Sequence, residues 1–201
     1  PIELAQRGII SHGLAMDVRK GPLSRATENI ALAGLSEKIA TRLSDGVAKL
    51  LPGEADSVVI AGMGGELSAS IIEKADFLRK YHQRIVCQPM THSELLRAAL
   101  CRLGFVIYDE RTVYDGKLYQ LFAAEYTGEN ENYSNGELLV GRISDKDDPL
   151  TAEYILSVIR RLKKEYNGIL SSDSELKNKD NSDLQKLYNT IEELCSMAKR
   201  E

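Results

Sequence analysis

The sequence lacks long apolar runs, and this absence excludes whole classes of protein. No stretch approaches the roughly 20 consecutive apolar residues that a membrane-spanning helix requires. The N-terminus also lacks the basic region followed by an apolar region that marks a secretory signal. We therefore expect a cytoplasmic protein with no membrane partner.

Metal-binding and disulfide patterns are missing as well. The three cysteines, Cys87, Cys101 and Cys195, form no CxxC pair and have no neighbouring histidine at metal-ligand spacing. The three histidines are equally scattered. We expect buried free thiols and no metal site.

The basic charge that would indicate a nucleic-acid partner is also lacking. The 201 residues carry 26 basic and 30 acidic side chains, which gives a formal net charge of −4. The acidic excess falls within residues 128–150, because residues 1–127 and residues 151–201 each carry equal numbers of the two signs. Two neutral modules joined by an acidic linker can each still present a basic face.

Residues 1–127 alternate short β-branched runs with longer helical patterns, which is typical of βαβ units around a mostly parallel sheet. The expected strands are 13–17, 39–43, 57–61 and 84–88, and the expected helices are 1–7, 22–33, a helix after residue 65, and 93–103. Two further strands, 105–113 and 118–126, flank the turn pair Asp115 and Gly116. This pair predicts an antiparallel hairpin at the end of the sheet.

The chain opens on a helical pattern with no strand before it. A doubly wound sheet requires a central first strand, and a nucleotide site requires the turn that follows that strand. We therefore expect the sequence to be truncated at its N-terminus.

Beyond the linker the pattern changes to heptads. Apolar residues recur at spacings of three and four, first at Ile155, Ile159, Leu162, Tyr166 and Ile169, and again at Leu184, Leu187, Ile191, Leu194 and Ala198. The polar residues 171–183 are expected to form the turn between two helices. The pattern predicts an antiparallel coiled-coil hairpin over residues 151–201, which satisfies its own heptads and favours a monomer or a weak homodimer.

Ligands of an open parallel sheet bind at the carboxyl ends of its strands, so the residues there are the candidates for chemistry. Asp17 is placed to hold a ribose diol, although an acid after a strand is often only a solvated loop residue. Asp45 with Gly46 is placed beside a purine ring, although the pair also fits a plain turn. The glycines of residues 62–65 match neither GxGxxG nor a P-loop, which disfavours a nicotinamide or ATP enzyme.

Several motifs in order carry a specific resemblance. SVVIAGMGGELSASII follows MDVRKGPLSRATENIALAGL and RLSDG, and it precedes IVCQP and the hairpin motif YDGKLYQ. Over residues 1–127 this series resembles the bacterial tRNA (adenine(22)-N1)-methyltransferase family, also called TrmK-like. The resemblance implies an α/β, Rossmann-like methyltransferase domain that uses S-adenosyl-L-methionine (SAM), and the coiled-coil hairpin at 151–201 also matches the architecture of that family.

The same resemblance assigns roles to individual residues. It assigns cofactor binding to Asp17, Val18, Asp45, Gly46, Ala61 and Gly62. It assigns the lining of the methyl-transfer pocket to Gly62, Met63, Gly64, Gly65, Gln88 and Pro89. It also implies that the main catalytic acid lies in a turn upstream of Pro1.

The implied reaction is methylation of adenine N1 in tRNA. The enzyme must hold N1 in line with the methyl group and stabilise the cationic ring, and the target base must leave its stack. The basic residues Arg160, Arg161, Lys163 and Lys164 either contact tRNA phosphates or form the solvated face of the coiled coil. Two other functions stay open: a SAM-dependent methyltransferase with another acceptor, and a non-catalytic, truncated Rossmann-like binding module.

Overall fold

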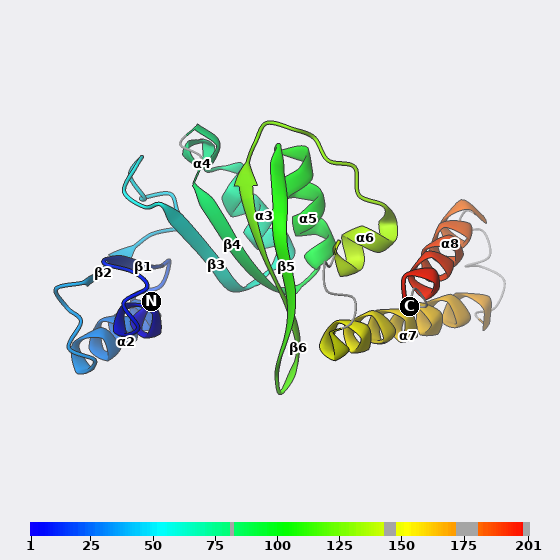
Figure 1. The fold of residues 1–201 in the computed structure, drawn as a ribbon, viewed down its shortest axis with the longest axis horizontal. Helices are drawn as coiled ribbons and strands as arrows, with labels where there is room; N and C mark the ends of the chain where they lie inside the picture. The colour runs from blue at the N-terminus through cyan, green and yellow to red at the C-terminus, as the bar shows by residue number, and fades with distance from the viewer. Residues whose placement is uncertain (81–82, 143–147, 172–180, 199–201) are drawn as a thin grey trace. The chain divides into compact units, whose positions relative to one another are not determined.

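The computed structural model describes residues 1–80, 83–142, 148–171 and 181–198 (Figure 1). These residues divide into two compact units. The first unit comprises Pro1–Ala55 with Lys74–Phe77, and the second comprises Asp56–Glu73 with Leu78–Glu201.

The first unit is a pair of parallel strands covered by helices. Its elements are α1 (Ile2–Gln6), β1 (Gly13–Asp17), α2 (Lys20–Leu32) and β2 (Ile39–Leu43). The strands pair in register from Gly13 opposite Ile39 to Asp17 opposite Leu43. The apolar faces of α1 and α2 meet the strands in a small core of Ala5, Ile30, Leu35 and Ile39. The predicted strands are confirmed, and α2 begins two residues before Pro22.

The second unit is built on a four-stranded sheet of order β3-β4-β6-β5. Its strands are β3 (Ser57–Gly64), β4 (Arg84–Thr91), β5 (Phe105–Asp115) and β6 (Lys117–Tyr126). β3 and β4 are parallel, whereas β6 is antiparallel to both β4 and β5. Helices α3 (Gly65–Glu73) and α5 (Ser93–Arg102) contact the sheet (Figure 1). The short helix α4 (Asp76–Lys80) was not predicted.

This arrangement confirms the predicted α/β, Rossmann-like fold with its antiparallel hairpin. The hairpin of β5 and β6 extends beyond the other strands (Figure 1), since β6 pairs with β4 only from Ala124 to Phe122. Burial alternates along β3, where Val58 and Ile60 are buried while Val59 is 61% exposed. The apolar run of β3 is therefore buried on one face only.

Two predicted strand ends are wrong. β3 runs past Ala61 to Gly64, and β4 runs past Gln88 and Pro89 to Thr91. The proline does not end β4 because the pairing with β6 stops at Cys87, so no ladder bond to β6 is lost beyond that point.

The segment predicted only as an acidic linker contains a helix, α6 (Asn135–Val140). Ser134 and Glu137 form a reciprocal capping box at its start, which satisfies two backbone N–H groups. At its end, Val140 is fully buried in a cluster with residues of the two C-terminal helices. Three charged residues expected in this linker, at positions 145–147, lie outside the described residues.

The C-terminal helices are α7 (Pro149–Ser171) and α8 (Asn181–Ala198), and α8 runs back alongside α7 (Figure 1). The heptad pattern predicts their contact well, since the buried residues include Ile155, Ile159, Leu162, Ile191 and Leu194. At the ends the pattern fails, because Ile169 is 36% exposed and Ala198 is exposed. Most of the predicted turn, residues 172–180, lies outside the described residues.

A buried ion pair joins four elements of the second unit. The Nε of Arg97 on α5 donates to Oε1 of Glu110 on β5 at 2.8 Å, with side-chain exposures of 0% and 5%. The guanidinium also donates to the Leu138 carbonyl on α6 at 2.8 Å and to the Gln120 side chain on β6. It lies over the Phe122 ring, 4.9 Å from the centroid. One side chain therefore fixes α5 and α6 to both strands of the hairpin.

Removing the arginine leaves a buried carboxylate without its counter-charge. We expect Arg97→Met to lower the free energy of unfolding by about 3–5 kcal/mol, measured by urea denaturation. The matched control is Arg102→Met on the same helix, whose partner is Glu73 and whose side chain is 63% exposed. That change should cost less than about 1 kcal/mol. Equal losses in the two variants would contradict this account.

Candidate active site at the strand ends

The carboxyl ends of β3 and β4 contain a bulge at Gly62. Ala61 aligns with Gln88 and Met63 aligns with Pro89, so Gly62 is an extra residue without a partner in β4. Its φ of +75° lies in the left-handed region that favours glycine. Its N–H donates instead to the side chain of Gln88, at 2.9 Å from Oε1.

Gly62 and Gly65 lie in different surroundings. A Cβ on Gly62 would have no heavy atom within 4 Å, so the backbone there faces open space. A Cβ on Gly65 would lie 2.0 Å from the carbonyl oxygen of His92, so this position is closed by packing. Only the first of these two glycines leaves room for a ligand to approach the backbone.

The remaining pocket-lining candidates also differ in accessibility. Ala61 is exposed and Met63 is half-buried, whereas Pro89 is buried. The half-buried amide of Gln88 has its Nε2 at 3.3 Å from the Pro89 carbonyl oxygen and 3.5 Å from Sδ of Met90. Both ends of this amide are therefore held by neighbouring groups.

The structure adds His92, which in the sequence is only one of three scattered histidines. His92 immediately precedes α5 and has φ +52° and ψ +46°, the one positive φ found among the described non-glycine residues. Its carbonyl group packs against Gly65. Its exposed ring has Nδ1 at 3.1 Å from Glu94 Oε1. No periodicity or motif signals this conformation, since it depends on the contact between the start of α3 and the residue before α5.

In the first unit, the predicted cofactor residues lie at the carboxyl ends of the two parallel strands. Asp17 ends β1, and its carbonyl oxygen accepts from the N–H of Ser44 just beyond β2 at 2.9 Å. This bond brings Asp17 and the following pair, Asp45 and Gly46, to one edge of the unit. The Asp17 carboxylate accepts one backbone N–H, from Arg19 at 2.7 Å, and Val18 between them is 60% exposed.

All three cysteines are free thiols, and two of them, Cys87 and Cys101, are buried. Burial raises the pKa of the Cys87 thiol to about 12, so it stays protonated at neutral pH. Across the described part of the chain, no group of three or more His, Cys, Asp or Glu side chains is arranged to hold a metal ion. Nor does any helix described there have the length and apolarity to cross a membrane.

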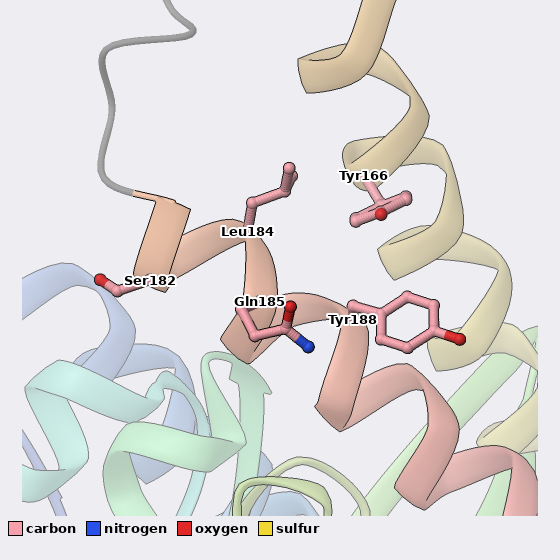
Figure 2. A pocket seen from close by; sticks show the side chains of 5 residues that line it. All are labelled: Tyr166, Ser182, Leu184, Gln185 and Tyr188. Carbon is pink, nitrogen blue, oxygen red and sulfur yellow. The ribbon is translucent and has the colours of Figure 1, made fainter.

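The predicted RNA-binding residues Arg160, Arg161, Lys163 and Lys164 are all exposed on α7. Further along, a hollow lies between α7 and α8, lined by Tyr166, Ser182, Leu184, Gln185 and Tyr188 (Figure 2). Its two tyrosine rings are 6.0 Å apart between centroids. This hollow was not predicted, and it shares no lining residue with the glycine bulge.

Residues 1–122 match the family described as "Methyltransferase domain", which covers more than half of the chain. The chain belongs to this methyltransferase family. The match spans both parallel strand pairs and most of the β5–β6 hairpin.

Individual relatives are more specific. The tRNA (adenine(22)-N(1))-methyltransferase of Bacillus subtilis (strain 168) is 31% identical over 134 residues, which is 66% of this chain and 56% of that protein. The match thus covers little more than half the length of that relative. This relative, together with the family match, confirms the expected resemblance to the TrmK-like family.

Two crystal structures extend the similarity to nearly the whole chain. That of the B. subtilis M1A22 tRNA methyltransferase TrmK has a TM-score of 0.84 and 26% identity, covering 98% of this chain and 86% of that chain. Sp1610 of Streptococcus pneumoniae, a candidate tRNA (m1A22) methyltransferase in complex with S-adenosyl-L-methionine, has a TM-score of 0.81 and 27% identity with the same coverage.

The close contact between Gly65 and the carbonyl group of His92 gives a test of the site geometry. We expect Gly65→Ala to destabilise the protein by at least about 2 kcal/mol, because the new Cβ collides with backbone. Gly21→Ala is the matched control, since nothing lies within 4 Å of a Cβ there and the position is helical. It should leave stability unchanged or raise it by up to about 1 kcal/mol. Thermal unfolding measures both, and a stable Gly65→Ala variant would disprove the close contact.

Proposed function

We propose that this protein transfers the methyl group of SAM to N1 of an adenine in tRNA, at position 22. The observation that carries the proposal is the exposed, bulged glycine backbone at the end of β3 in a chain of the methyltransferase family. The names and the SAM complex of its relatives support the choice of cofactor and acceptor.

The residues present fit the cofactor. Asp17 offers an ionisable carboxylate at a strand end, with one oxygen engaged by a single backbone N–H, which suits a ribose diol. Asp45 and Gly46 at the same edge suit the adenine ring, and the open backbone at Ala61 and Gly62 suits close approach of a ligand. When bound, SAM supplies the methyl group on a positively charged sulfur.

The chain's own part in the reaction is to orient the acceptor base and to stabilise charge. N1 of adenine lies on the base-pairing edge, so the base must leave its stack to reach the site. Methylation makes the ring cationic, and carbonyl oxygens of the bulged backbone from Ala61 to Gly64 are suited to stabilise that charge. Half-buried Met63 is suited to pack against the ring.

In this proposal, two parts of the chain have separate roles. Residues 1–127 perform methyl transfer, and the helical hairpin of residues 151–201 binds tRNA through Arg160, Arg161, Lys163 and Lys164. A cytoplasmic location agrees with a tRNA substrate. Because α7 and α8 bury each other's apolar stripes, we propose a monomer or a weak homodimer.

Methylation of tRNA transcripts tests the function directly. The protein is incubated with radiolabelled SAM and transcripts that carry adenine or guanine at position 22, and modified nucleosides are identified by mass spectrometry. The 201-residue chain and the product of the gene's own start codon are both assayed. N1-methyladenosine only in the adenine transcript supports the proposal. Methylation of another acceptor, or none in either form, rejects it.

Loss of the Asp17 charge should weaken cofactor binding. We expect Asp17→Asn to raise the Kd for SAM by about 10- to 100-fold, because a charge-assisted hydrogen bond contributes about 1.5–3 kcal/mol. Isothermal titration calorimetry measures this without any need for turnover. The matched control is Asp56→Asn. Asp56 lies just before β3, at the end of that strand opposite to Gly62. A Kd unchanged in Asp17→Asn would remove this residue from the cofactor site.

Charge reversal on α7 tests the tRNA contact. We expect Arg160→Glu with Arg161→Glu to weaken tRNA binding at least roughly tenfold and to flatten its salt dependence, since each lost phosphate contact removes about 0.7–0.9 from the log–log slope. The charge-preserving pair Arg160→Lys with Arg161→Lys is the control and should retain most of the affinity. Filter binding over a range of salt concentrations measures both. Equal affinity in the two double variants would identify these arginines as a solvated face.

A further inference from the structure

The hydrogen bond between Gln88 and Gly62 replaces a missing ladder bond. At the bulge the backbone of β4 offers no aligned residue to Gly62, so its N–H would otherwise have no partner in the sheet. The side chain of Gln88, the residue aligned with Ala61, reaches across and accepts this N–H at 2.9 Å. The acceptor must be the amide oxygen, because the amide nitrogen carries only donors.

This bond also fixes the direction of a carbonyl group. The peptide between Ala61 and Gly62 is planar and trans, as are all peptides among the described residues. Its C=O therefore points opposite to its N–H. Since the N–H points toward the side chain of Gln88, the Ala61 carbonyl oxygen points away from that amide, and both residues of this peptide are exposed.

The Gln88 amide is itself held in place. Its Nε2 lies 3.3 Å from the carbonyl oxygen of Pro89 and 3.5 Å from Sδ of Met90, so the donor end of the amide is turned toward its own strand. The buried ring of Pro89 anchors that segment. Gln88 thus presents its oxygen to Gly62, and its nitrogen is engaged away from the open space.

We infer that Gln88 is a positioning residue that acts through Gly62. By holding the peptide between Ala61 and Gly62, it keeps the Ala61 carbonyl directed at the acceptor base, where the oxygen stabilises the positive charge that develops on the adenine ring. This role rests on the proposed function. It differs from pocket lining, because both ends of the Gln88 amide are engaged by groups of the protein itself.

Two substitutions separate positioning from direct contact. Gln88→Met keeps the length of the side chain and loses the acceptor, whereas Gln88→Glu keeps an acceptor oxygen and loses the donor. For Gln88→Met we expect kcat to fall about 10- to 100-fold, with the KM values for SAM and tRNA within about threefold of the parent protein. Gln88→Glu should restore most of that loss. Gln6→Met, at an exposed position of α1, controls for the substitution itself.

Hydrogen exchange of the Gly62 amide, followed by NMR on the same variants, gives a readout that needs no turnover. The amide should be protected in the parent protein and in Gln88→Glu, and unprotected in Gln88→Met. An unprotected amide in the parent protein would overturn the inference, as would equal loss of kcat in both Gln88 variants or a loss confined to KM. If the parent protein does not methylate tRNA, the proposed function fails, while the exchange result still decides whether Gln88 holds this peptide.

Discussion

The buried ion pair between Arg97 and Glu110 is the constraint on which the second unit depends. Burying two charges costs several kcal/mol for each ion, and this cost is offset only when the remaining donors and acceptors are satisfied. Here the guanidinium reaches Gln120 and the Leu138 carbonyl, and Gln120 in turn donates to the Val140 carbonyl at 3.0 Å. The pair is therefore stable only when α5, α6 and the hairpin are assembled together.

This dependence links the four-stranded sheet to the C-terminal helices. The backbone at the end of α6 supplies acceptors to the network, and Val140 continues into the apolar cluster of α7 and α8. At the other end of α6, the Gly136 N–H donates to Glu193 of α8 at 3.1 Å. What the sequence indicates as a linker is thus a packed junction that fixes the helical hairpin to the sheet.

Much of this fold could be predicted from sequence because its signals are local. The apolar runs locate β1 and β2 to the residue, and heptad spacing locates α7 and α8 to within a few residues. Gly8, Gly34 and Gly104 follow closely on the ends of α1, α2 and α5. The extension of β4 through Pro89 could not be predicted, because it depends on where β6 stops pairing. Likewise, the burial of Arg97 depends on partners 13 to 42 positions away along the chain.

The candidate site could also be predicted only in part. The glycine cluster, Gln88 and Asp17 are found from their places at the carboxyl ends of strands, but the sequence cannot say which glycine faces open space. At Gly65 the reason is the carbonyl of His92, whose left-handed backbone carries that oxygen into the loop. Asparagine, aspartate and glycine adopt this conformation readily, whereas β-branched residues do so at high cost. The backbone at position 92 therefore favours glycine, asparagine, aspartate or histidine, even though the side chain of His92 is exposed.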